Sequence, residues 1–181
     1  NETLAAWLRD VSLSIARRPE SDWIGPWYRD HDTWPAVGHL ETAHLCWAMA
    51  ALLDLAADVF TSNERDEIRD ALATKGLTLC RRWLDRNTHL ANWRAVLVSG
   101  VAAAAAVAGD TASLEYAAAE TRLAAEAYQP DGSHAESLQY ANYLALALAI
   151  AHESSVGASA ELASATPETL AKLIPWFAQS M

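Results

Sequence analysis

Basic residues are scarce in this chain, with 13 Lys and Arg against 23 Asp and Glu and a net charge of −10. Binding to a nucleic-acid backbone needs clustered Lys and Arg, so we expect no nucleic-acid partner. An anionic sugar held by a few local cations is still compatible with this charge. Long apolar runs are also lacking, because the Ala-rich run from Val96 to Ala108 is bounded by Arg94 and Asp110. That run is too short for a membrane span, so we expect no membrane partner.

Cysteine occurs only as Cys46 and Cys80, each within an apolar stretch, and no CxxC or Cys/His metal spacing exists. We therefore expect two small buried thiols, with no metal and no other cofactor. Residues 1–10 lack the basic start and apolar core of a signal peptide. The cellular compartment stays open on these grounds.

Glycine and proline are few, at 7 and 6, alanine dominates the apolar fraction, and strand-type alternation is scarce. This composition favours helix, and 181 residues suit one domain with a sizeable core. We expect a single all-α domain over residues 1–181. Periodicity and turn signals predict helices over 2–18, 37–60, from after Thr61-Ser62-Asn63 to 86 with Ser62 as a good N-cap, 91–108, 112–128, 133–153, and after Thr166-Pro167.

Apolar and amphipathic helices alternate along the sequence. The second, fourth and sixth predicted helices are apolar nearly all round, whereas the third and fifth carry charged faces. A helix that is apolar on every side is buried on every side. Inner and outer helices that alternate in this way are typical of helical hairpins in a ring or a curved solenoid. We therefore expect an incomplete (α/α) toroid, since seven helices are too few to close a ring of six hairpins.

The inner helices of such a ring run in the same direction, so their N-termini gather at one end. Helix N-termini also favour anions. The polar residues of these three first turns are His39, Glu41 and His44, then His89, Asn92, Trp93 and Arg94, then His134, Glu136, Tyr140, Asn142 and Tyr143. This end of the fold is the predicted functional site.

Structural roles compete with each functional one. Ser133 and Glu136 fit a capping box, and Asn92 fits an N-cap. His39 and His44 fit packing or capping roles, and the tyrosines fit core packing. The aromatic residues Trp23, Trp27, Tyr28 and Trp34, near His31, fit either a hydrophobic plug or a platform for stacking sugar rings.

Two stretches carry a resemblance. Asn92-Trp93-Arg94 opens an Ala-rich helix, and Pro130-Asp131-Gly132-Ser133 is followed by Glu136, Tyr140 and Tyr143 at five, nine and twelve residues after the Asp. This pattern resembles the helical domain of the heparinase II/III-like polysaccharide lyases. The resemblance extends over roughly residues 34–153.

The resemblance implies β-elimination on an acidic, uronate-containing polysaccharide. Asn92 would help neutralise the uronate carboxylate, and Tyr140 would act as the acid, and in some members as the base. A cation would help a phenol to act as base, and Arg94 is the candidate by proximity. The residues assigned to substrate binding are Trp93, Arg94, His39, His44, His134, Glu136, Tyr143 and Trp34. A periplasmic or secreted location also follows from the resemblance.

Two departures accompany the resemblance. Trp93 stands where many members have a His, which removes a usual base. Members also carry a β-sheet domain after the toroid, so we expect this chain to be part of a longer one. Two alternatives stay open: an α/α-barrel glycoside hydrolase that uses the carboxylates of Asp131, Glu136 or Glu41, and a non-catalytic helical domain that binds carbohydrate or protein.

Overall fold

The computed structural model describes residues 2–26, 34–171 and 173–180, and its regular secondary structure is exclusively helical there. The only β-type pairing in the described residues is an isolated bridge between Tyr128 and His134. The predicted all-α class is therefore confirmed. The helices are α1 (Glu2–Ala16), η1 (Glu20–Trp23), α2 (Leu40–Leu55), η2 (Ala57–Val59), α3 (Ser62–Ala71), η3 (Leu72–Leu77), α4 (Thr78–Arg86), α5 (Asn92–Ala108), α6 (Thr111–Ala124), η4 (Ala125–Ala127), α7 (Leu138–Ser155), α8 (Ala160–Ala171) and α9 (Leu173–Ser180).

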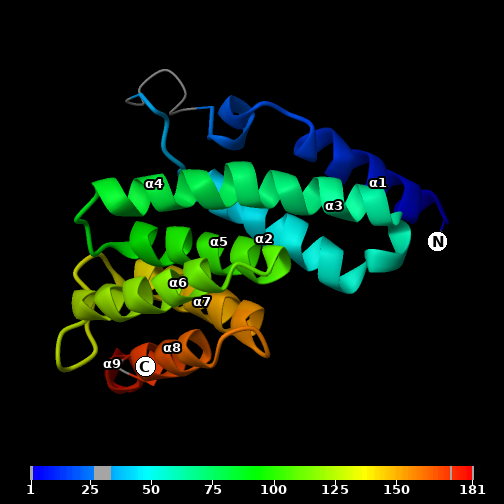
Figure 1. The fold of residues 1–181 in the computed structure, drawn as a ribbon. Coiled ribbons are helices and arrows are strands. Elements are labelled where there is room, and N and C mark those ends of the chain that lie inside the picture. The colour runs from blue at the N-terminus through cyan, green and yellow to red at the C-terminus, as the bar shows by residue number, and fades with distance from the viewer. Residues whose placement is uncertain (1, 27–33, 172, 181) are drawn as a thin grey trace.

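Helix α5 lies at the centre of the fold and packs against both α2 and α7 (Figure 1). These three helices run in the same direction, because contacts join the start of one helix to the start of the next and the middle to the middle. His39, just before α2, packs against Trp93 in the first turn of α5, and Trp47 in the middle of α2 donates its indole N–H to Ser99 Oγ in the middle of α5, at 3.1 Å. Glu136, just before α7, accepts a hydrogen bond from Asn92, at the start of α5. The three inner helices are thus parallel, whereas their arrangement in a toroid stays a prediction.

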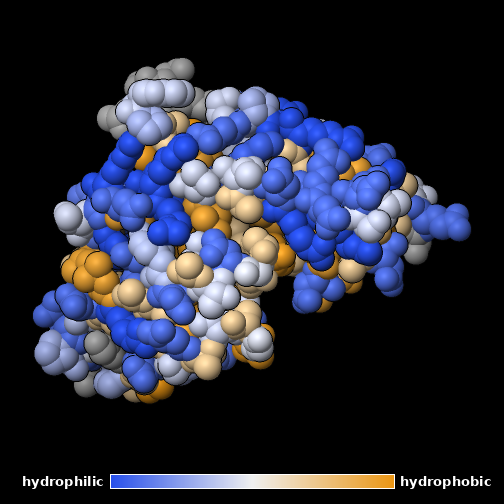
Figure 2. Space-filling model, in the orientation of Figure 1, coloured by the Kyte–Doolittle hydropathy of each residue, from blue (hydrophilic) through white to orange (hydrophobic). Residues whose placement is uncertain are grey.

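The remaining helices form an outer layer. The continuous α3–η3–α4 segment and α6 pack on α5, and α8 packs on α6 and α7. Figure 2 shows this outer face covered largely by hydrophilic residues, with smaller apolar areas between them. None of the described helices has the length and apolar character needed to cross a membrane.

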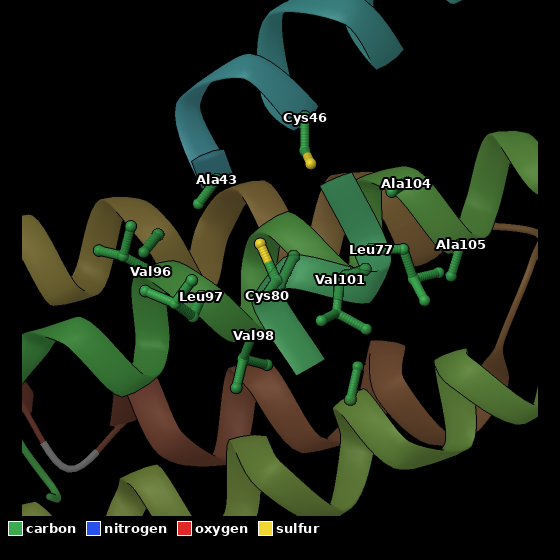
Figure 3. Packing of buried hydrophobic residues seen from close by; sticks show 14 of the residues in the cluster. Ala43, Cys46, Leu77, Cys80, Val96, Leu97, Val98, Val101, Ala104 and Ala105 are labelled. Atoms are coloured by element: carbon green, nitrogen blue, oxygen red, sulfur yellow. The ribbon is translucent and has the colours of Figure 1, made fainter. Parts of the chain in front are cut away.

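Small side chains allow the helices to approach α5 closely. A Cβ atom added at Gly100 would lie 2.9 Å from Ala43 Cα in α2, so this crossing has no room for a methyl group. Val101 and the neighbouring alanines of α5 continue the same apolar cluster (Figure 3). Cys46 and Cys80 lie within this cluster as buried free thiols, as predicted.

The prediction that α2, α5 and α7 are all buried on every side is confirmed only for α5. Leu55 on α2 is 84% exposed, and Leu146 on α7 is 54% exposed. The difference follows from the position of each helix. Helix α5 is surrounded by other helices, whereas α2 and α7 each pack against α5 on one side and leave part of their surface exposed.

The N-cap residues predicted for two helices were wrong. Thr61, not Ser62, is the N-cap of α3, and it forms a full capping box in which Glu64 accepts from the Thr61 N–H at 2.9 Å. The helix expected from Ser133 begins at Leu138, with Ser137 as N-cap. Ser133 instead donates its N–H to the Asp131 carboxylate at 2.9 Å, which closes a local turn before the helix.

The last predicted boundary was wrong because a proline is accommodated inside a helix. Helix α8 begins at Ala160, and Pro167 lies within it rather than at its start. Proline lacks the N–H that would bond the carbonyl four residues earlier, which is that of Ala163. His152 Nδ1, on α7, lies 3.1 Å from Ala163 O and donates to it. A side chain from a neighbouring helix thus replaces the missing backbone donor.

Candidate functional site

The starts of α2, α5 and α7 meet at one end of the fold. The ring of His39, the residue before α2, packs edge-on against Trp93 with 5.6 Å between centroids. Asn92, the first residue of α5, is hydrogen-bonded to Glu136 in the segment that leads into α7. The structure therefore brings residues from all three predicted groups together.

Asn92 holds a carboxylate with two donors. Its backbone N–H donates to Glu136 Oε2 at 2.8 Å, and its Nδ2 donates to Oε1 at 2.7 Å. The N–H groups of a helix's first turn have no partner within the helix, and the dipole there favours negative charge. The N-cap is Ala91, so the N-cap prediction for Asn92 was wrong. The start of α5 is thus a two-point carboxylate site, with the Glu136 carboxylate on it.

His134 lies on the other side of the Glu136 carboxylate. Its Nδ1 accepts the Glu136 N–H at 3.3 Å, and its Nε2 lies 3.8 Å from Glu136 Oε2. Burial lowers the pKa of His134, and the Glu136 charge opposes this only in part. His134 also packs against the Tyr128 ring, at 5.3 Å between centroids. Glu136 is therefore engaged by Asn92 and His134, and the predicted capping box with Ser133 was wrong.

A second polar contact joins α2 to α7 across α5. His44 Nε2 and Tyr143 OH are 2.7 Å apart, and the His44 ring also packs against Trp47, at 4.6 Å between centroids. Burial lowers the pKa of His44, and the charge of Glu41 partly raises it again. Burial also raises the pKa of Tyr143, with a further contribution from Glu41. The resting pair is therefore a neutral phenol against a neutral imidazole at neutral pH.

Glu41 and His44 border a pocket of about 300 Å³ beside α2. Its other lining residues are Asp22, Trp23, Ile24, Gly25, Pro26 and Leu45. A Cβ at Gly25 would lie 2.4 Å from the Glu41 carboxyl carbon, so a larger residue there would displace the Glu41 side chain from its present position. Glu41 Oε2 is buried and has no hydrogen-bond partner among the described residues.

The two most exposed aromatic residues of the predicted site differ in setting. Tyr140 is 48% exposed in the first turn of α7, one turn before Tyr143. Trp34 is 92% exposed, whereas Trp23 is buried with its ring beside Gly76. Trp27, Tyr28 and His31 lie outside the described residues.

Arg94 is not brought to Tyr140. Its side chain is 2% exposed and pairs with Glu120 on the outer helix α6. It also donates to the carbonyl oxygens of Asn87 and His89, in the connection between α4 and α5. The structure thus places Arg94 as a buried clamp of that connection rather than as a cation facing a ligand.

Trp93 packs between aromatic rings. Besides His39, its ring lies 5.9 Å from that of Trp83 on α4. Among the residues that the structure describes, no group of three or more His, Cys, Asp or Glu side chains could hold a metal ion. The contribution of Trp47 was missed from the sequence, although its spacing of three residues from His44 places both on one helix face.

No protein-family model matches this chain, and no curated protein matches it at a significant level. Its function is therefore inferred from the residues of the site.

Proposed function

We propose that this protein is a polysaccharide lyase that cleaves a uronate-containing polymer by β-elimination over the first turns of α2, α5 and α7. The main observation behind this proposal is that Asn92 binds the Glu136 carboxylate through its backbone and side-chain N–H groups, at 2.8 and 2.7 Å. The resemblance around Asn92 and Tyr140 supports the same reaction.

A uronate carboxylate has the same two oxygens as the Glu136 side chain and can replace it on Asn92. Glu136 precedes α7, and its side chain retains 29% exposure, so it can move into solvent when a substrate binds. Hydrogen bonds to the uronate carboxylate stabilise the negative charge that develops when the neighbouring C5 proton leaves. Asn92 thereby makes that proton more acidic.

Tyr140 is the proposed acid. It lies four residues after Glu136, in the first turn of α7, and its side chain is 48% exposed. Its hydroxyl protonates the leaving glycosidic oxygen as the C4–O bond breaks.

The test is incubation with a panel of uronate polysaccharides while the near-ultraviolet absorbance of the new C4=C5 double bond is followed. We expect a signal with at least one polymer, and a fall in kcat of about 100-fold or more in Tyr140→Phe. Tyr116→Phe is the matched control, because Tyr116 OH bonds Asp85 at 2.8 Å on the outer layer. That variant should retain wild-type kcat.

The alternatives give different results in the same assay. New reducing ends without absorbance would indicate a glycoside hydrolase, for which Glu41 beside the pocket is the carboxylate to substitute. Retention of a polymer without any product would indicate a binding domain. No absorbance on any uronate polymer would exclude the lyase proposal.

A further inference from the structure

Proton abstraction from C5 needs a base, and the first three residues of α5, Asn92, Trp93 and Arg94, do not supply one. The residue after Asn92 is Trp93, whose indole is a hydrogen-bond donor only. The Arg94 side chain is buried and is paired with Glu120 on α6. The base must therefore come from outside the first turn of α5.

Helices α2 and α7 meet in a hydrogen bond that has the geometry of a proton-transfer pair. His44 Nε2 lies 2.7 Å from Tyr143 OH, within the range for direct transfer. Tyr143 is one turn after Tyr140 on α7, so both hydroxyls serve the same stretch of the proposed site. The His44 ring also packs against Trp47, whose own N–H donates to Ser99 Oγ.

The third member is Glu41, one turn before His44 on α2. Its buried Oε2 has no hydrogen-bond partner among the described residues. From the η1 side, the other charged group of this pocket is Asp22, which is paired with Arg18 at 3.1 Å. From α7, the titratable group facing His44 is Tyr143. A positive charge on His44 would thus be stabilised mainly by Glu41.

We infer that Tyr143 is the catalytic base of the proposed elimination, assisted by His44 and Glu41 as a relay; this inference rests on the proposed lyase function. The C5 proton moves to the Tyr143 oxygen while the Tyr143 proton moves to His44 Nε2. The C5–H electron pair becomes the C4=C5 double bond, and the C4–O bond breaks. Tyr140 protonates the departing oxygen, and the His44 proton later returns to Tyr140 through solvent. Glu41 acts on His44 through its charge, and His44 acts on Tyr143 through their hydrogen bond.

We expect the proton transfers from C5 to Tyr143 and from Tyr143 to His44 to be simultaneous. Partial burial raises the pKa of Tyr143 and lowers that of His44, so a phenolate beside an imidazolium is disfavoured at neutral pH. When both protons move together, no phenolate forms, and the charge that appears is an imidazolium next to Glu41. His44 and Glu41 act through Tyr143 and are positioning residues.

The experiment compares kcat, KM and the pH profile of kcat for Tyr143→Phe and Glu41→Gln, on the uronate polymer that the wild-type protein cleaves. Tyr143→Phe should lower kcat by about 100-fold or more with KM little changed. Glu41→Gln keeps the shape against Gly25 but removes the charge that raises the pKa of His44. Since His44 must be neutral to accept a proton, the acid limb of the profile should move to lower pH.

Tyr116→Phe serves again as control, and thermal unfolding of each variant verifies that it is folded. Wild-type kcat in a folded Tyr143→Phe, or an unmoved acid limb in Glu41→Gln, would overturn the relay and leave the lyase proposal standing. Absence of any product from the wild-type protein would overturn both. A lowered kcat together with a moved acid limb would support the relay, because a merely structural contact does not set the pH dependence.

Discussion

Replacement of Arg94 by Met tests whether this residue clamps the fold or faces a substrate. The wild-type guanidinium is 2% exposed, pairs with Glu120, and donates to His89 O at 2.9 Å and to Asn87 O. Methionine retains the apolar stem and removes the charge and all three bonds. The two carbonyls and a carboxylate of 16% exposure are then left without their donor.

The expected cost is large, because removal of one partner of a buried ion pair leaves an uncompensated charge. Such changes cost about 3–5 kcal/mol. Total stabilities of domains are about 5–15 kcal/mol, so Arg94→Met should remove a substantial part of the free energy of unfolding. The matched control is Arg122→Met, whose partner Glu161 lies at 2.8 Å with both side chains about half exposed, at 47% and 52%. That change should cost only about 0–1 kcal/mol.

Urea denaturation of both variants measures these costs. The double variant Arg94→Met/Glu120→Leu should recover part of the loss, because it removes the stranded carboxylate. If Arg94→Met costs no more than Arg122→Met, the guanidinium does not hold the α4–α5 connection, and its role as a buried clamp is wrong. Substrate binding would then again be the better explanation for Arg94.

Two further predictions concern the core and the surface. Gly100→Ala should lower the free energy of unfolding by about 1–3 kcal/mol in urea denaturation, because its Cβ would lie 2.9 Å from Ala43 Cα; a neutral result would show that α2 and α5 can separate freely. Arg9 holds the pKa of Glu64 at about 2, mainly through a side-chain hydrogen bond. Since this lies below the ordinary glutamate value of 4.5, the stabilisation is present above pH 4.5 and is lost as pH falls toward 2. Glu64→Gln should thus unfold at a lower temperature than wild type at neutral pH, with a difference that shrinks toward pH 2, and a pH-independent difference would contradict this.

The helical segments were largely predictable, because their signals are local. Alanine content, 3.6-residue periodicity and few breakers are sufficient to predict α5 and the α3–α4 region. The caps were not predictable in the same way. Ser133 and Glu136 match a capping box by spacing, yet Glu136 is bound to Asn92, more than forty positions away in the chain. Pro167 indicates a helix start, yet His152 from α7 takes over the freed carbonyl.

The composition of the candidate site was predictable, and its pairings were not. Parallel inner helices predict that their first turns meet, which places Asn92, His44 and Tyr143 at one end. Which side chains then pair depends on the rotation of each helix about its axis. That rotation turned Arg94 toward Glu120 and Tyr143 toward His44.

The sequence by itself determined that this protein is all-α and that its helices alternate between apolar and amphipathic. It also determined that polar residues lie in the first turns of the apolar helices. These properties depend on residue type and on spacing within one helix. Only the tertiary structure decided that Asn92 binds the Glu136 carboxylate and that His44 and Tyr143 are hydrogen-bonded. It also decided that Arg94 is buried and paired with Glu120. These depend on contacts between residues far apart in the chain, where a rotation of one helix changes the partner of every side chain on it.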